Sequence, residues 1–322
     1  MSKILYFSHG RTALKYGLKF LNLKKGDKIL LPEYICSVII DPILQLGLKI
    51  VYYSVDRSLQ PNWKEINLFN QPEIKAILMV HYFGFTQNIK KFKEICNKKS
   101  WFLVEDNAHG FGGKINKNLL GTVGDIGISS PRKYSNLLSG GVLYLNTNKI
   151  NYTMPENLKS FKSSIIFFIL KFVLGKQIYL KSFFKKIFVT RPDYENPYSF
   201  YESSIEDQKV DKLSLKLLKN TDWSKMAIQK RINYNSWSDF FKENQSVKPV
   251  FSFLSEECSP LCYPIYVKDK KSAIKWFEWG WDNGYYVYSW PNLPIDKIKE
   301  KGNALEIWET LICFSTEKTF VS

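Results

Sequence analysis

Apolar and polar positions along the first 145 residues alternate with the periods of helices and strands. In residues 12–23, leucines recur at helical spacing, which predicts a helix; a Gly-Asp turn follows, and the next apolar run, KILL, predicts a strand. Segments 37–55, 73–83 and 89–106 continue this alternation and end in the strand pattern SWFLVED. Such an order is typical of βαβ units, so we predict an α/β fold with a mostly parallel central sheet.

The pattern changes in the second half of the chain. Residues 151–245 are predicted to form a helical connecting region, with one helix around KLSLKLLKN and another from Trp223 to Phe241. Residues 246–322 contain the strand patterns CYPIYV and YYVYSW around the helix pattern SAIKWFEWGWDNG, which predicts a smaller C-terminal α+β domain. Residues 1–150 would then form the large α/β domain. Because no repeat or low-complexity linker separates these parts, we expect them to share an interface.

Composition is that of a folded protein with a sizeable core, since 45% of the 322 residues are hydrophobic and 16% are aromatic. The five cysteines are scattered, and no C-x-x-C pair or Cys/His cluster has the spacing of a zinc site. This predicts a reducing compartment and no metal. The first residues, MSKILYFSHGRT, lack the long apolar run of a secretory leader, so a cytoplasmic location is expected.

The formal charge of +16 is compatible with nucleic acid, an anionic membrane surface or phosphorylated small molecules as partners. The lysines are spread along the chain without an RNP, KH or zinc-finger pattern, so we expect a solvated surface and no nucleic-acid partner. Residues 163–189 combine a short apolar run, 165–170, with five lysines, and this run is too short to cross a bilayer. We expect this stretch to pack against another subunit; the alternative is a basic amphipathic helix on a membrane surface.

Two segments carry candidate residues for binding an anion and for catalysis. Gly10, Arg11 and Thr12 stand directly before the first helix, where free backbone N–H groups can bind a phosphate, although such residues more often form an ordinary turn and N-cap. Asp106 ends an apolar strand, and ligands bind beyond the carboxyl ends of parallel strands. The alternative is that Asp106 caps a following helix and that His109 is packed or solvated.

A third segment contains Lys133, on a predicted loop between two short strands. An amine in this position could act as a Schiff-base nucleophile. With 46 basic residues in the chain, a solvated surface lysine is the alternative.

Taken in order, these motifs resemble the DegT/DnrJ/EryC1/StrS family of pyridoxal-phosphate (PLP) dependent sugar aminotransferases. SHGRTAL is similar to the family's phosphate turn, GDKILLPEYICSVI to its G-D-E-V-I-V-P segment, and VHYFGF to its V-H-x-x-G stretch. VEDNAHGFGG resembles the E-D-x-A-[QH] box, and GTVGDIGISSPRKYSNLLSGG resembles the segment that bears the PLP lysine. The resemblance is strong from residue 8 to 145 and faint beyond, and it implies the fold type I of PLP-dependent aminotransferases.

The resemblance also implies roles for individual residues. Lys133 would bind PLP covalently and then move a proton between the substrate carbon and the cofactor. Asp106 would pair with the pyridine nitrogen and keep it protonated, and His109 would hydrogen-bond the phenolic oxygen. The phosphate would be held by residues of the turn and of the lysine segment, namely Gly10, Arg11, Thr12 and Ser130.

The sequence differs from the family pattern in three respects that bear on these assignments. The distance between Ser130 and Lys133 is shorter than the family's, and a rival alignment places Ser135 at the lysine position. Cys36 takes the place of the aromatic residue that usually stacks on the ring, which would weaken its clamping. The resemblance implies a homodimer, although the family's phosphate contact from the partner subunit is not located in this sequence.

The resulting prediction is the transfer of an amino group, from glutamate, to a keto group of a nucleotide sugar in the biosynthesis of amino sugars or surface polysaccharides. A PLP- or pyridoxamine-phosphate-dependent sugar dehydratase is one alternative, because some relatives carry His in place of the lysine. A catalytically degenerate family member that only binds a partner or a membrane surface is the other.

Overall fold

The computed structural model describes residues 2–135, 137–147, 153–155, 158–162, 194 and 207–320. Its largest element is a nine-stranded sheet. In the order in which they pair, its strands are β10 (Lys159–Ser160), β11 (Gln208–Lys209), β1 (Lys3–Phe7), β9 (Gly141–Leu145), β8 (Ile126–Ser129), β5 (Phe102–Asn107), β4 (Ile74–Val80), β2 (Lys28–Pro32) and β3 (Lys49–Tyr53).

The strands from β8 to β3 run parallel to one another, and β9 runs antiparallel to both of its neighbours, β1 and β8. Parallel strands are covered on both faces, which is why β4 reads as the near-continuous apolar run IKAILMV and is buried along almost its whole length. The predicted α/β fold with a mostly parallel central sheet is therefore confirmed for this part of the chain.

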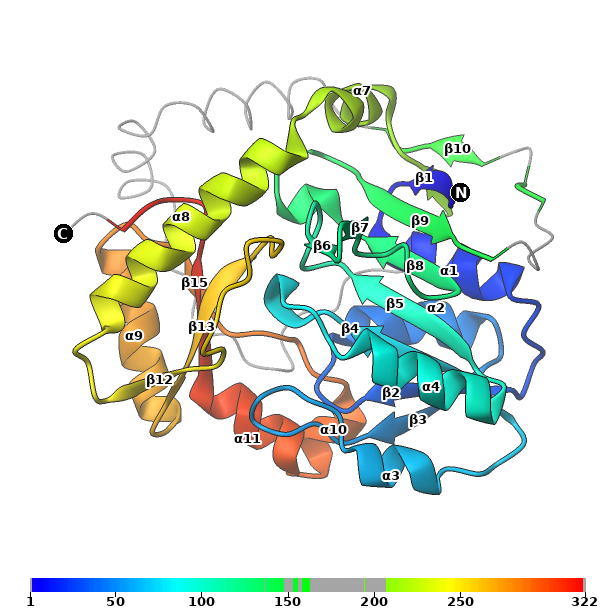
Figure 1. Cartoon of the computed structure of the whole chain (residues 1–322), viewed down its shortest axis with the longest axis horizontal. Helices are drawn as coiled ribbons and strands as arrows, with labels where there is room; N and C mark the ends of the chain where they lie inside the picture. The colour runs from blue at the N-terminus through cyan, green and yellow to red at the C-terminus, as the bar shows by residue number, and fades with distance from the viewer. Residues whose placement is uncertain are drawn as a thin grey trace.

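Helices pack on the sheet in the order that the sequence pattern predicts (Figure 1). They are α1 (Gly10–Phe20), α2 (Ile40–Gln45), α3 (Trp63–Leu68) and α4 (Ile89–Lys99), with the 3-10 turns η1 (Ser37–Ile39), η2 (Tyr82–Gly84) and η3 (Pro131–Lys133). Helix α1 lies so close to the sheet that a Cβ atom at Gly17 would come within 2.7 Å of Ile126 Cδ1 and 2.9 Å of Leu143 Cδ1. This close packing fixes the start of α1 beside the carboxyl ends of the strands.

A second sheet of four strands lies to the left in Figure 1. It consists of β12 (Val247–Pro249), β13 (Cys262–Val267), β15 (Leu311–Ser315) and β14 (Val287–Tyr288), and a hairpin of β6 (Lys114–Ile115) and β7 (Asn118–Leu119) forms a third, small sheet. The helices of the C-terminal half are α7 (Lys212–Asn220), α8 (Trp223–Phe241), α9 (Lys270–Asp282), α10 (Ile295–Lys299) and α11 (Asn303–Thr310).

Aromatic side chains hold α8 and α9 to this second sheet. The wholly buried Trp237 of α8 lies 4.9 Å, between ring centroids, from Phe314 of β15. One continuous hydrophobic core includes residues of both large sheets. The division into 1–150, 151–245 and 246–322 remains a prediction, to which the structure adds that β11 pairs with β1.

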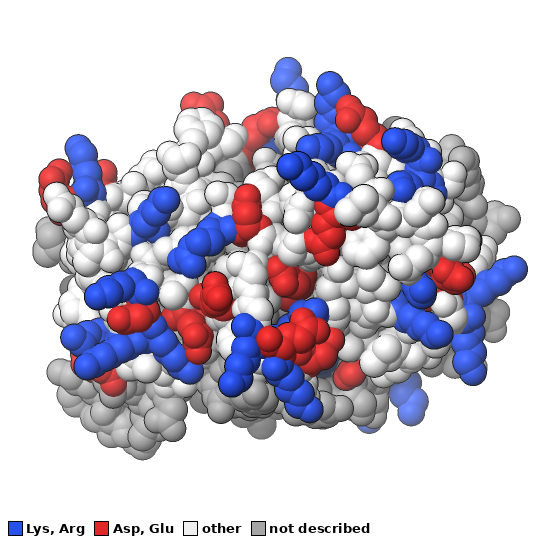
Figure 2. Space-filling model, turned by 90° about the horizontal axis from the view of Figure 1, so that it is seen from below, with Lys and Arg blue, Asp and Glu red and all other residues white. Residues whose placement is uncertain are grey.

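The stretch 163–189, with its predicted packing or membrane-surface role, lies outside the described residues. Among the helices that are described, none combines the length and apolar composition needed to cross a bilayer. On the face drawn in Figure 2, lysine and arginine side chains are interspersed with aspartate and glutamate side chains, so this face carries mixed charge.

Candidate functional site

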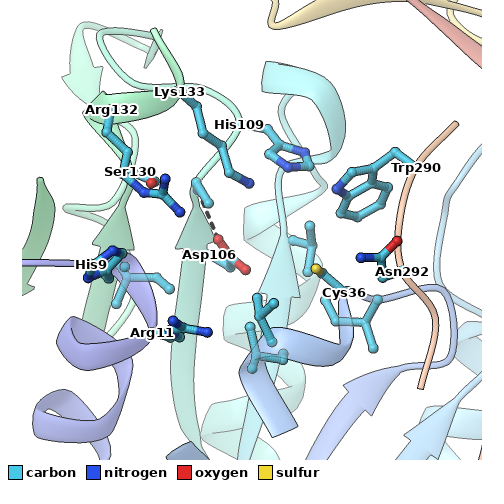
Figure 3. A pocket seen from close by; sticks show the side chains of 17 residues that line it. His9, Arg11, Cys36, Asp106, His109, Ser130, Arg132, Lys133, Trp290 and Asn292 are labelled. Carbon is cyan, nitrogen blue, oxygen red and sulfur yellow. Dashed lines mark hydrogen bonds between the residues drawn. The ribbon is translucent and has the colours of Figure 1, made fainter. Parts of the chain in front are cut away.

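A cavity of about 160 Å³ opens where β4, β5 and β8 end and α1 begins (Figure 3). This is the edge of a parallel sheet at which α/β proteins bind ligands. Most of the residues predicted from the sequence to form a site line it, namely Gly10, Arg11, Cys36, Asp106, His109, Ser130 and Lys133. Thr12 does not line the cavity; its hydroxyl is buried and has no hydrogen-bond partner among the described residues.

Asp106 is held in the cavity wall by the backbone of β5. Its Oδ1 atom accepts a hydrogen bond of 2.8 Å from the N–H of Ala108, and its side chain is almost wholly buried. Burial raises the pKa of this carboxyl group, while the hydrogen bond from Ala108 and the charge of Lys133 oppose the rise. The alternative prediction, that Asp106 caps a helix, is wrong because a turn follows β5.

Lys133 ends the turn η3, which connects β8 to β9. The N–H of Lys133 donates to the carbonyl of Ser130 at 3.0 Å, and the side chain reaches into the cavity between Asp106 and His109 (Figure 3). Ser135, the rival candidate, does not line the cavity, and its hydroxyl lies 3.5 Å from the carbonyl of Pro131. The structure therefore places the amine of residue 133, and not the hydroxyl of residue 135, beside Asp106.

Tyr134 anchors the same turn. Its hydroxyl donates to the carbonyl of Ser259 at 2.9 Å and also to the carbonyl of His109. These bonds tie the lysine turn to the end of β5 and to the C-terminal part of the chain. The backbone from which Lys133 projects is thus fixed from two sides.

His109 is buried in the opposite wall of the cavity. Its Nδ1 atom accepts a hydrogen bond from the N–H of Phe83 at 3.4 Å, and its ring stacks on the ring of Phe83. Burial, and secondly the charge of Lys133, hold the pKa of His109 well below its usual value. The imidazole is therefore neutral, and because Nδ1 is the acceptor, the proton is on Nε2, which is left as a donor.

The N-terminus of α1 forms the end of the cavity that suits an anion. Five helices of the described chain, such as α8 with Asp222, begin with a side-chain cap, whereas α1, like α2, α10 and α11, begins without one. At the start of α1 the side chain of the N-cap residue His9 therefore does not compete with an anion, which a helix N-terminus favours. A Cβ atom at Gly10 would lie 3.9 Å from the hydroxyl oxygen of Ser130, so this buried hydroxyl adjoins the turn.

Four polar or aromatic lining residues were not predicted from the sequence: His9, Arg132, Trp290 and Asn292. Arg132 stands next to Lys133 in the sequence, and this position was the only feature from which its place in the cavity could have been predicted. Trp290 and Asn292 follow β14, more than 150 positions along the chain from Lys133, and no local pattern marks them.

Trp290 is held in the cavity wall by other aromatic residues. Its ring centroid lies 4.6 Å from that of His109 and 5.4 Å from that of Phe83, in edge-on contacts. The hydroxyl of Tyr34 donates to the carbonyl of Trp290. The carbonyl of Asn292 accepts from the N–H of Ser37 at 2.7 Å, which ties this segment to the turn that carries Cys36.

Comparison with protein families gives a match to the DegT/DnrJ/EryC1/StrS aminotransferase family over residues 3–159. GDP-perosamine synthase of Vibrio cholerae is 27% identical over 120 residues, which are 37% of this chain and 33% of that protein. GDP-4-keto-6-deoxy-D-mannose 3-dehydratase of Escherichia coli O55:H7 is 30% identical over 109 residues, which are 34% of this chain and 28% of that protein. The matched region spans about a third of the length of these curated relatives.

Among solved structures, an aminotransferase of Helicobacter pylori involved in the biosynthesis of pseudoaminic acid superimposes with a TM-score of 0.66 at 15% identity. The match covers 97% of this chain and 81% of that one. This likeness covers more of the chain than the family match does, and it confirms the predicted PLP-dependent aminotransferase fold.

Proposed function

Because residues 3–159 match the DegT/DnrJ/EryC1/StrS aminotransferase family, we propose that the chain is a member of this family and a PLP-dependent aminotransferase. It would transfer an amino group, from glutamate, to a keto group of a nucleotide-activated sugar, a substrate class to which the perosamine synthase and dehydratase relatives point by name. The observation that carries this proposal is that Asp106 and Lys133 line one cavity together with the uncapped start of α1.

The residues of the cavity fit the chemical groups of PLP. The uncapped N-terminus of α1, with Gly10, Arg11 and the Ser130 hydroxyl, suits a phosphate. The buried Asp106 suits a protonated ring nitrogen, because a cation there would offset the cost of burying this carboxylate. The Nε2–H group of His109 suits the phenolic oxygen, and the amine of Lys133 suits the aldehyde. Thr12 would contribute its backbone N–H.

When bound, PLP supplies an electron-accepting ring that stabilises negative charge on the substrate carbon. The carboxylate of Asp106 would hold the proton on the ring nitrogen, which the ring needs for this purpose. Nζ of Lys133 would accept a proton from the substrate carbon and return it to the cofactor side. His109 would fix the orientation of the ring by donating from Nε2.

We also propose a homodimer and a cytoplasmic location. The dimer follows from the family resemblance and can be measured by light scattering. A reducing compartment is supported by the cysteines, because the five cysteines of the described chain form no disulfide.

The absorption spectrum of the purified protein with added PLP tests the proposal. We expect a visible band from covalently bound cofactor in the wild type and in S135A, and its loss in K133A. S135A is the matched control, because Ser135 lies on the same turn but outside the cavity. A wild type without this band, or a band that survives in K133A, would contradict the proposal and favour a member of the family that only binds partners.

A further inference from the structure

Arg132 lies at the anion-binding end of the cavity. It stands between Ser130 and Lys133 on η3, and it lines the cavity. Figure 3 shows its guanidinium beside Ser130, on the side of His9 and Arg11, while His109 and Trp290 lie on the opposite side. Arg132 therefore faces the start of α1 rather than the aromatic wall.

No group in the described part of the chain accepts a hydrogen bond from the Arg132 guanidinium, and its Nε atom is buried without a partner. A buried guanidinium nitrogen without an acceptor is costly, and a guanidinium pairs best with an oxyanion, through bidentate contacts. The neighbouring Ser130 also lines the cavity and is only 4% exposed. The guanidinium of Arg132 and the hydroxyl of Ser130 thus lie side by side in the cavity (Figure 3).

The charges around the cavity indicate the kind of anion. Arg11, Arg132 and Lys133 line it together with a single carboxylate, that of Asp106. His9 adds no charge, because burial and the two nearby guanidinium groups lower its pKa to about 4. The lining residues therefore carry a surplus of two positive charges. A phosphate monoester, with a charge of about −1.5 to −2 at neutral pH, matches this surplus better than a single carboxylate does.

The turn presets the position of Arg132. The N–H of Tyr134 donates to the carbonyl of Pro131 at 2.9 Å. A Cβ atom at Gly140 would lie 3.5 Å from Pro131 Cγ, so the backbone at Gly140 packs against this turn. Arg132 and Lys133 project from this one fixed turn. A group bound by Arg132 is thereby held at a set distance from the Lys133 amine.

From these contacts we infer that Arg132 binds the phosphate of the cofactor, so that this chain supplies its own charged phosphate contact in addition to the α1 N-terminus. The inference rests on the proposed function, and it assigns a role to a residue that was not among the predicted site residues. The other anion that Arg132 could bind is the carboxylate of the amino donor, and the experiment distinguishes the two.

The test measures the dissociation constants of PLP and of pyridoxal, which lacks the phosphate, for the wild type, R132Q, R132K and K216Q. We expect R132Q to weaken PLP binding about ten- to a hundred-fold, the loss typical of a hydrogen bond to a charged group, and to leave pyridoxal binding unchanged. The dissociation constant of PLP for R132K should lie between those of the wild type and R132Q, because lysine keeps the charge but not the paired N–H donors of a guanidinium. K216Q, at an exposed lysine of α7, removes one charge far from the cavity and should bind as the wild type does.

Pyridoxal binding also reports whether the cavity of R132Q is intact. Wild-type PLP affinity in R132Q would overturn the inference, and a higher glutamate requirement in that variant would assign Arg132 to the donor carboxylate. Equal weakening of PLP and pyridoxal would overturn it as well, because the effect would not depend on the phosphate. A wild type that binds neither compound would overturn the proposed function itself, which is a different result from a failure of R132Q alone.

Discussion

Nε2 of His81 lies 3.0 Å from Oε1 of Glu105, and both side chains are wholly buried. Glu105 also accepts hydrogen bonds from the N–H groups of Gly121, Val123 and Gly124, at 2.7 to 2.8 Å. The pair therefore connects the end of β4, strand β5 and the loop that leads into β8. These are the elements that position Asp106 and Ser130, although Glu105 itself does not line the cavity.

Replacing Glu105 with Gln should destabilise the protein strongly. The amide of Gln would place an NH₂ donor among groups that are themselves donors, and at least one buried N–H would lose its acceptor. We expect a loss of about 3 kcal/mol in the free energy of unfolding, measured in urea. E309Q is the control, since the side chain of Glu309 is 40% exposed and lies 3.9 Å from Lys270, and its effect should stay within about 0.5 kcal/mol. A loss in E105Q as small as that in E309Q would contradict the role of the pair.

The contribution of Glu105 to stability should depend on pH. Burial alone would raise the pKa of Glu105, but its hydrogen bonds with His81 and with the backbone outweigh burial and hold the pKa below its ordinary value of 4.5. The unfolded chain therefore takes up a proton at Glu105 at a higher pH than the folded chain does. The stabilisation is complete above pH 4.5 and is lost as the pH falls toward the folded-state pKa. The difference in the free energy of unfolding between the wild type and E105Q should therefore shrink below that pH. A difference that does not change with pH would contradict this dependence on the protonation of Glu105.

Replacing Asp106 with Asn should separate stability from catalysis. Burial raises the pKa of Asp106, so the ionised carboxylate is unfavourable in the protein without cofactor, and Asn can still accept from the N–H of Ala108. We expect D106N without cofactor to unfold at the same or a higher urea concentration than the wild type. With PLP, we expect kcat to fall about 10²- to 10⁴-fold, because a neutral amide cannot hold the proton on the ring nitrogen. Full activity in D106N would rule out this role.

The residues that could be predicted from the sequence are those whose position follows from local rules. Asp106 lies at the end of a buried strand, where parallel sheets bind ligands, so its place at the edge of the sheet could be predicted from the strand pattern. Lys133, on a short connection between strands, was distinguished from the other lysines by the resemblance of its segment to the family's lysine segment. Trp290 could not be predicted, because it is one of nine tryptophans and reaches the cavity only through the packing of the C-terminal part against Tyr34 and Phe83. Arg132 could not be predicted for a different reason. In a chain with 46 basic residues, only its place in the cavity wall, and an Nε atom without a partner among the described residues, distinguish it from a surface cation.

Trp290 is expected to contribute to cofactor binding. It supplies an aromatic ring to the cavity, whereas Cys36, at the position of the family's stacking aromatic residue, does not. W290A should weaken PLP binding about three- to ten-fold, the range of a single aromatic contact, and W290F should weaken it less. Protein fluorescence should be quenched on PLP binding, and W290F should lose part of this quenching. W63F is the matched control, because Trp63 packs on Phe92, away from the cavity, and it should retain full quenching. Equal quenching in the wild type and W290F would show that Trp290 does not face the cofactor.

The product formed from a keto nucleotide sugar should distinguish amino transfer from dehydration, the reaction named for one of the curated relatives. Both reactions need the protonated ring nitrogen at Asp106, but they differ in what residue 133 must do. A lysine amine can displace the product and bind the cofactor again, whereas an imidazole can only exchange protons. With pyridoxamine phosphate and a keto nucleotide sugar, the wild type should therefore give a sugar product that has gained an amine, detected by mass spectrometry. K133H should not form this product, although it keeps Asp106 and the anion-binding end of the cavity. A wild-type product that has lost oxygen without gaining nitrogen would instead identify the chain as a dehydratase.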